Sequence, residues 1–169
     1  MKRILLSAIL LGSLVTTASA ATGVLSQKNL SVELADKIAQ STLQACAKDG
    51  YNVAVTLVDR SGTPLLMKRM DNAGPHTVEA SRMKAFTALT TKNATSNVMK
   101  GSQSNAGAAN LRDIPDFLLL AGGVPVKMGN QVIGAVGVGG APGGNFDEAC
   151  AIAGLQSVEN GYPYVKYTQ

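Results

Sequence analysis

Histidine and cysteine are scarce in this chain of 169 residues, which contains one histidine, His76, and two cysteines. A zinc site needs several nitrogen or sulfur ligands, so a lone histidine argues against a histidine-based zinc centre. A serine hydrolase is disfavoured as well, because Ser61, Ser81 or Ser102 would each depend on His76 as the base, and no spacing supports a triad. Few residues are therefore available as metal ligands or catalytic groups.

Long hydrophobic runs and an excess of one charge are also missing. The first largely apolar run, Ile4 to Val15, is too short to cross a bilayer as a helix, and no later run is long enough. Only 15% of the residues are charged, and the lysines and arginines are scattered rather than clustered. The sequence therefore argues against stable membrane insertion and against nucleic acid as a partner.

Residues 1–20 have the features of a cleavable secretory signal. Lys2 and Arg3 give a basic start, the apolar run follows, and Ala18-Ser19-Ala20 supplies the small residues expected before a cleavage point. Its removal takes the basic residues from 15 to 13 against 11 acidic ones, a formal net charge of +2. We expect a periplasmic or secreted protein in which residues 21–169 form a single domain, because that length suffices for one core.

The two cysteines, Cys46 and Cys150, lie in helix-like segments near opposite ends of the chain. An even count in an exported protein favours a disulfide over metal ligation or nucleophilic catalysis. Closing so long a loop would add about 3 to 5 kcal/mol to the free energy of unfolding. Two buried free thiols remain the alternative.

Hydrophobic periodicity predicts an α+β fold with one antiparallel sheet and helices on its faces. The turn at Asp59-Arg60-Ser61-Gly62 joins two β-rich runs as a hairpin, and Gly122-Gly123 and Gly129-Asn130 separate three later ones. The expected elements are helix 31–48, strands 51–58 and 63–70, a helix beginning after His76, a short helix or an irregular connection over 92–110, strands 117–120, 124–128 and 131–138, and helix 147–158.

In the middle helix, an apolar stripe formed by Ala80, Met83, Phe86 and Leu89 is expected to pack on the sheet, helped by small neighbours. The later glycine-rich run 134–144 invites a nucleotide-binding interpretation, but Pro142 stands where a third glycine is needed and no βαβ unit precedes it. These glycines instead suit the close approach of another backbone, a neighbouring subunit or a flat ligand.

His76 follows the turn Asp71-Asn72-Ala73-Gly74-Pro75 and precedes the middle helix. It is either a solvent-exposed turn residue or a metal ligand. A single imidazole can supply one axial bond to a haem iron, since the porphyrin provides four others. The methionines of the mature chain offer thioethers as second axial ligands, or fill the core: Met67, Met70, Met83, Met99 and Met128.

Six blocks of sequence carry a more specific likeness. They are 58–62 (VDRSG), 69–73 (RMDNA), 84–88 (KAFTA), 121–126 (AGGVPV), 132–140 (VIGAVGVGG) and 147–150 (DEAC). In this order, over about Ser31 to Val158, they resemble the GlcG/HbpS family of haem-binding proteins, which is related to the PduO-type C-terminal domain.

The resemblance implies a profilin-like α-β-α domain with a five-stranded antiparallel sheet, the first and last helices on one face and the middle helix on the other. It also implies that Cys46 and Cys150 lie on adjacent helices, that the chain forms homo-oligomers from dimer to octamer, and that haem is the ligand. Because the related domain uses a histidine for iron, the resemblance points to His76 as the metal ligand here.

We therefore expect an exported haem-binding protein for sensing, storage or scavenging. In this hypothesis His76 donates to the iron, Lys68, Arg69 or Arg82 neutralises a propionate, and Met83 lies beside the porphyrin. Slow haem degradation would further need an open iron position and a reductant. The alternatives are a carrier or enzyme for a small organic acid such as glycolate, and a ligand-free oligomerisation domain.

Overall fold

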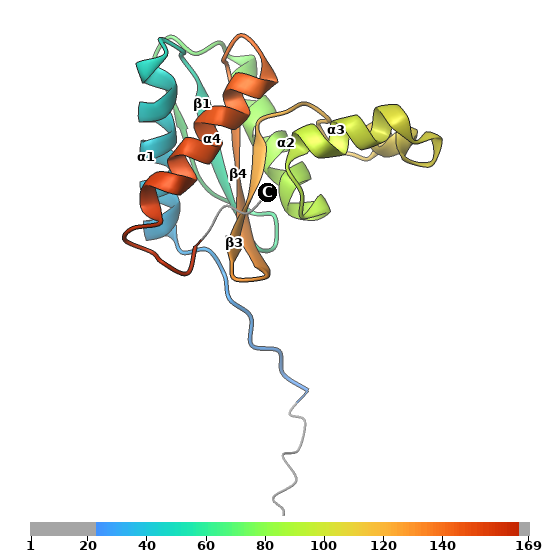
Figure 1. Cartoon of the computed structure of the whole chain (residues 1–169), viewed down its shortest axis with the longest axis horizontal. Coiled ribbons are helices and arrows are strands. Elements are labelled where there is room, and N and C mark those ends of the chain that lie inside the picture. The colour runs from blue at the N-terminus through green and yellow to red at the C-terminus, as the bar shows by residue number, and fades with distance from the viewer. Residues whose placement is uncertain (1–22, 166–169) are drawn as a thin grey trace, which may run out of the picture.

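Four strands form one antiparallel sheet in the order β2-β1-β4-β3 in the computed structural model, which describes residues 23–165 (Figure 1). Helices α1 and α4 cover one face of the sheet, α2 covers the other, and α3 projects from the side with the 3-10 helix η1. The elements are α1 (Val32–Lys48), β1 (Ala54–Asp59), β2 (Pro64–Arg69), α2 (His76–Thr91), α3 (Thr95–Ser104), η1 (Ala106–Asp113), β3 (Gly123–Met128), β4 (Gln131–Gly139) and α4 (Gly144–Val158). The expected signal peptide, residues 1–20, lies outside the described residues.

The two sides of the sheet bury different kinds of side chain, as the alternation along β1 shows. Val55 and Leu57 belong to the main hydrophobic core under α1 and α4, whereas Val58 packs with alanines of α2. Thr56 also faces α2, and its hydroxyl lies 2.7 Å from that of Ser81. The larger core therefore lies on the α1–α4 side, and the α2 side is built from small residues.

Helix α2 lies directly on the backbone of the sheet because glycines leave room for it. A Cβ at Gly137 of β4 would overlap the carbonyl oxygen of Ser81, and one at Gly123 of β3 would overlap that of Lys84. This confirms the close backbone approach expected of the glycine run. The expectation that an apolar stripe with Met83 and Phe86 packs on the sheet is wrong in part. Both side chains are only half-buried, and smaller residues of α2 contact the sheet.

The expectation of five strands is wrong, because residues 117–120 do not form a strand. Asp116, just before them, has a positive φ of 68°, which turns the chain. The backbone N–H of Leu118 then donates to the Thr87 hydroxyl at 2.9 Å, and the Phe117 ring meets Phe86 edge-on at 6.2 Å. The segment is therefore attached to α2 instead of to the sheet. Separately, Met128 at the end of β3 forms an isolated antiparallel bridge with Val165.

Helices α1 and α4 are joined covalently by a Cys46–Cys150 disulfide with a Cα–Cα distance of 5.3 Å. This confirms the expected bridge. The same helices also pack closely where Gly154 faces Thr42, since a Cβ at Gly154 would overlap the threonine hydroxyl. Among the described residues, no helix has the length and apolar character needed to span a membrane.

Candidate functional site

His76 is the first residue of α2, and its side chain is exposed. The ring lies over Gly74, where a Cβ would come within 2.9 Å of Cε1 and 3.0 Å of Nδ1. The glycine therefore makes room for the imidazole. No described residue forms a hydrogen bond with either ring nitrogen, so the lone pair of a neutral imidazole is available to a ligand.

The turn that carries His76 is held by hydrogen bonds on both sides. The N–H of Ala73 donates to the carbonyl oxygen of Met70 at 3.0 Å, and buried Thr77 donates to the carbonyl oxygen of Gly74 through both its N–H and its hydroxyl. Arg69 donates from Nη1 to the Ala73 carbonyl oxygen at 3.1 Å. The backbone position of His76 is thus set by an ordered turn.

The other residues expected to contact the ligand are divided between the two faces of the sheet. Arg69 lies at the His76 turn, and Met83 is half-buried two helical turns farther along α2, about 10 Å by the helical rise. Lys68 instead lies on the α1 side, where its Nζ is 2.6 Å from a carboxylate oxygen of Asp36. The structure therefore places Arg69 beside the His76 turn, leaves Met83 farther along the same helix, and sets Lys68 apart.

Arg82 is already paired with two carboxylates. Its guanidinium donates to Glu79 on the same helix and, at 2.6 Å, to Asp116 in the loop before β3. The hydrogen bonds from Arg82 hold the pKa of Glu79 below its usual range, and the two carboxylates raise the pKa of the guanidinium. A propionate would have to compete with both carboxylates for this arginine.

The hollow between β2 and the first half of α2 is small. It has a volume of about 160 Å³, and Met67, Val78 and Arg82 are among the residues that line it. Ligand pockets for drug-sized molecules usually occupy about 300 to 1,000 Å³, so a porphyrin does not fit inside this hollow. A flat ligand at His76 would rest on the outer surface of the helix.

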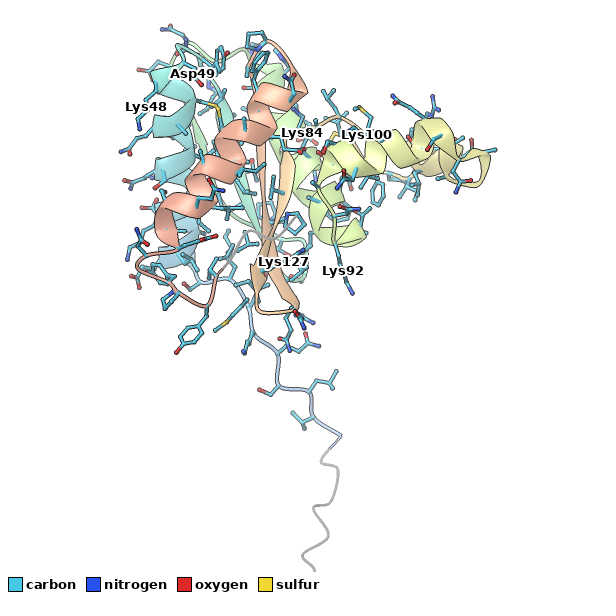
Figure 2. The ribbon with its side chains drawn as sticks, in the orientation of Figure 1. Lys48, Asp49, Lys84, Lys92, Lys100 and Lys127 are labelled. Atoms are coloured by element: carbon cyan, nitrogen blue, oxygen red, sulfur yellow. A yellow bond between two sulfur atoms is a disulfide. The ribbon has the colours of Figure 1, made fainter. Side chains whose placement is uncertain are left out.

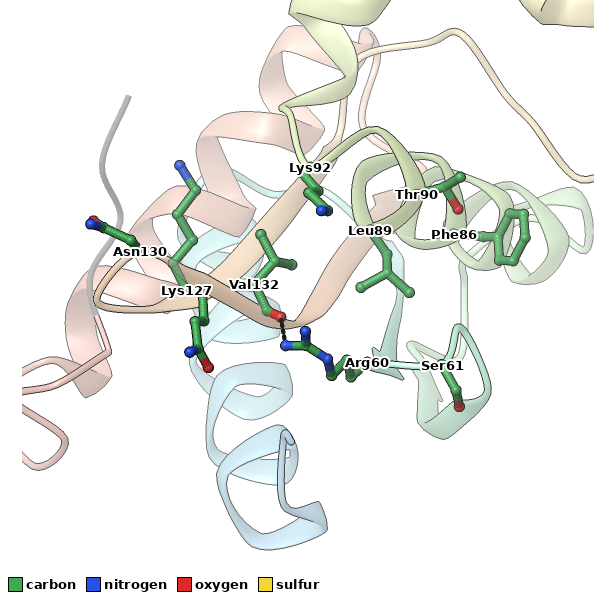
Figure 3. A pocket seen from close by; sticks show the side chains of 10 residues that line it. Arg60, Ser61, Phe86, Leu89, Thr90, Lys92, Lys127, Asn130 and Val132 are labelled. Carbon is green, nitrogen blue, oxygen red and sulfur yellow. Dashed lines mark hydrogen bonds between the residues drawn. The ribbon is translucent and has the colours of Figure 1, made fainter. Parts of the chain in front are cut away.

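A larger cavity, of about 630 Å³, lies at the opposite end of α2 (Figure 3). Its lining includes Arg60, Lys92 and Lys127, together with apolar residues of α2 and β4. His76 is about 20 Å from this end by the helical rise and does not line the cavity. The sequence did not point to this cavity, because its three cations come from segments that are distant in the chain.

The sequence also did not reveal a buried ion pair between α2 and α4. Lys84, labelled in Figure 2, has its Nζ 2.7 Å from Asp147 Oδ2 and 2.9 Å from the Val138 carbonyl oxygen. The lysine and aspartate side chains are 2% and 4% exposed. Burial raises the pKa of the Asp147 carboxyl, while Lys84 and the N–H of Ala141 oppose that rise. The lysine within an alanine-rich part of α2 was the one available signal. The pair is buried, and its other hydrogen-bond partners are backbone groups of Val138 and Ala141. It therefore holds α2, β4 and α4 together and does not form a ligand-binding site.

The described residues contain no group of three or more histidine, cysteine, aspartate or glutamate side chains placed to hold a metal ion. The imidazole of His76 is exposed and is accessible to a metal. What it can supply is a single nitrogen at the surface, with Arg69 and Met83 on the same side of the sheet.

Residues 30–156 match the family model described as "Haem degrading protein HbpS-like". The fold is similar to that of a double mutant of HbpS from Streptomyces reticuli, with a TM-score of 0.77 and 37% identity over 87% of this chain and 99% of that chain. Protein GlcG of Escherichia coli K12 is 34% identical over 64% of this chain and 80% of its own length. The PduOC protein, solved as a haem complex, shares the fold with a TM-score of 0.71 at 21% identity, over 83% of this chain and 99% of that chain.

Proposed function

Because the chain belongs to the HbpS-like family, we propose that it is an exported haem-binding protein in which His76 is an axial ligand of the iron. The observation that carries the ligand assignment is the exposed imidazole of His76, which lies over Gly74 and has no hydrogen-bond partner among the described residues. Haem supplies an iron centre that can bind or activate small molecules, and the protein supplies the axial nitrogen and the surface.

The surroundings of His76 suit a haem that lies on the surface. Arg69 hydrogen-bonds to the His76 turn through Nη1, which donates to the Ala73 carbonyl oxygen. Other N–H groups of its guanidinium remain for a propionate. Met83 offers an apolar contact on α2. Lys68 and Arg82 would each have to leave an acidic partner, so we assign the propionate to Arg69.

A surface haem in this position leaves one of its faces uncovered by the chain that binds it. A second copy of the chain would cover that face, which agrees with the expectation of a homo-oligomer. Export is supported by the signal-like residues 1–20 and by the disulfide, because disulfides persist in oxidising compartments. The protein would then act on haem outside the cytoplasm.

The test of the ligand is haem titration of the wild-type protein and of His76→Ala, followed by the Soret band. We expect the substitution to weaken haem binding by at least about tenfold and to shift the Soret maximum, because an iron–nitrogen bond is lost. Lys100→Ala, at an exposed position of α3, is the control and should leave both the affinity and the Soret maximum unchanged. Free imidazole added to His76→Gly should restore the wild-type spectrum.

Unchanged affinity and spectrum in His76→Ala would show that another group binds the iron. Failure of the wild-type protein to bind haem would overturn the proposal and favour an organic-acid carrier or a ligand-free oligomerisation domain. Degradation is tested separately, by following the Soret band of the complex under air with ascorbate and catalase present. A stable band with haem retained assigns the protein to binding alone.

A further inference from the structure

The 630 Å³ cavity at the C-terminal end of α2 is formed by three segments that the fold brings together. They are the β1–β2 turn, the last turns of α2 and the β3–β4 hairpin (Figure 3). Its volume lies within the range typical of sites for small organic molecules. The cavity is remote from His76, so its chemistry is independent of the proposed haem site.

Three cations surround the cavity, and no aspartate or glutamate lines it. Arg60 donates from Nη1 to the Val132 carbonyl oxygen at 2.9 Å, and its backbone N–H donates to Asn29 Oδ1 at 2.8 Å, so its position is fixed. Lys92 is exposed, and no described residue forms an ion pair with it. Lys127 adds a third positive charge from β3 (Figure 2).

The carbonyl end of α2 opposes an anion here, because a helix C-terminus carries a partial negative charge of about half an elementary charge. Two of its carbonyl oxygens, those of Ala88 and Leu89, already accept hydrogen bonds from the backbone of Lys92. The charges of Arg60 and Lys92, neither of which forms an ion pair with a described residue, outweigh the remaining dipole. The cavity is therefore electropositive and favours an anionic group.

The rest of the lining includes apolar side chains from α2 and β4. Phe86 and Val132 are half-buried, and Leu89 is 9% exposed. Gly62 in the β1–β2 turn lies against the Phe86 ring, where a Cβ would come within 3.0 Å of Cε2, so the turn closes on the aromatic side chain. An apolar wall beside a group of cations matches a ligand with a hydrophobic body and an anionic head.

We propose that this cavity binds a small amphipathic carboxylate, with the carboxylate at Arg60 and Lys92 and an aryl or alkyl body against Phe86, Leu89 and Val132. The planar guanidinium of Arg60 suits the two oxygens of a carboxylate. An inorganic anion would leave the apolar wall unused, and an uncharged ligand would leave the cations unused.

The experiment titrates the purified full chain with 4-phenylbutyrate by calorimetry, with its neutral amide and acetate as comparison ligands. We expect the amide and acetate each to bind at least about tenfold more weakly, because the first lacks the charge and the second lacks the body. Amide chemical shifts should move at Arg60, Leu89 and Val132 and not at His76.

Lys92→Asn is the diagnostic variant, because Lys92 has a positive φ of 55° and asparagine tolerates that conformation. It should retain the melting temperature and bind phenylbutyrate about tenfold more weakly, whereas Lys92→Arg retains binding. Lys100→Asn on α3 is the matched surface control and should bind as the wild type does.

Equal binding of the amide and the carboxylate, or wild-type affinity in Lys92→Asn, would overturn the inference, as would the absence of phenylbutyrate binding.

Saturating phenylbutyrate should leave the haem affinity of the wild type unchanged. If it instead displaces haem, and Lys92→Asn weakens haem binding while His76→Ala does not, the cavity is the haem site and both assignments fail. If His76→Ala loses haem binding and Lys92→Asn does not, the haem site and the carboxylate site are separate, as proposed.

Discussion

Arg82 shows how a single side chain connects α2 to a segment that the sheet does not hold. Glu79 is one turn away on the same helix, and Asp116 belongs to the loop that carries Phe117. Both carboxylates are more than half exposed, so the two ion pairs of Arg82 add little to global stability. Their effect is local, since they hold the loop beside α2 and occupy an arginine that a ligand would otherwise use.

At the residue scale, Arg82→Gln should raise the pKa of Glu79 towards its ordinary value, because the hydrogen bonds that favour the carboxylate are lost. With Arg82 present, the Arg82–Glu79 pair contributes to the free energy of unfolding at pH values above the ordinary glutamate pKa. This contribution is lost as the pH falls through the lowered pKa of Glu79. Carbon-detected NMR titration of the Glu79 carboxyl measures this. Arg69→Gln, which has no bond to Glu79, is the control, and equal midpoints in Arg82→Gln and wild type would contradict the assignment.

At the scale of elements, the packing of α2 depends on small residues and one buried ion pair. The helix meets β4 at Gly137 and β3 at Gly123, where any side chain would overlap its backbone. Lys84 then crosses this contact to reach Asp147 of α4 and the Val138 carbonyl oxygen of β4. Gly122 lies against both side chains, and the lysine contacts the aspartate directly at 2.7 Å.

Lys84→Ala should lower the free energy of unfolding by about 3 to 5 kcal/mol, because Asp147 would remain buried without its charged partner. Urea denaturation monitored by circular dichroism measures the loss. The control, Lys100→Ala, should change stability by less than about 0.5 kcal/mol, since that lysine is exposed. A loss below about 1 kcal/mol for Lys84→Ala would mean that the pair does not stabilise the packing of α2 and α4.

At the scale of the whole molecule, the disulfide connects the first and last helices of the described fold. Cys46 and Cys150 are separated by 104 residues, so the bridge closes more than half of the chain into one loop. Both sulfurs lie in the core under α1 and α4, near the level where Gly154 packs against Thr42. The covalent bond and the close helix contact therefore hold the same layer.

Reduction, or the Cys46→Ser/Cys150→Ser variant, should lower the free energy of unfolding by about 3 to 5 kcal/mol, chiefly because the unfolded chain regains conformational freedom. Urea denaturation with and without reductant measures the difference, and thiol titration checks that the bond is open. The variant should give the same curve in both conditions. A wild-type curve that reductant does not move, with two titratable thiols present, would refute the expected stabilisation.

The sequence by itself determined the local elements and the family likeness. Helix α1, the β1–β2 hairpin, α2 and α4 follow from periodicity and turn residues, which act over a few positions. The disulfide pairing was favoured by the even cysteine count and strengthened by the resemblance. The position of His76 at the start of α2 was also evident, because it depends on the turn just before it.

Only the tertiary structure decided the strand count, the buried pair and the large cavity. Residues 117–120 lose their strand because Thr87, distant in the chain, satisfies the N–H of Leu118. Lys84 and Asp147 are 63 residues apart, and the cations of the cavity come from three separate segments. Periodicity reports which face of an element is apolar but not which distant polar groups will meet there, because those partners are set when the chain packs.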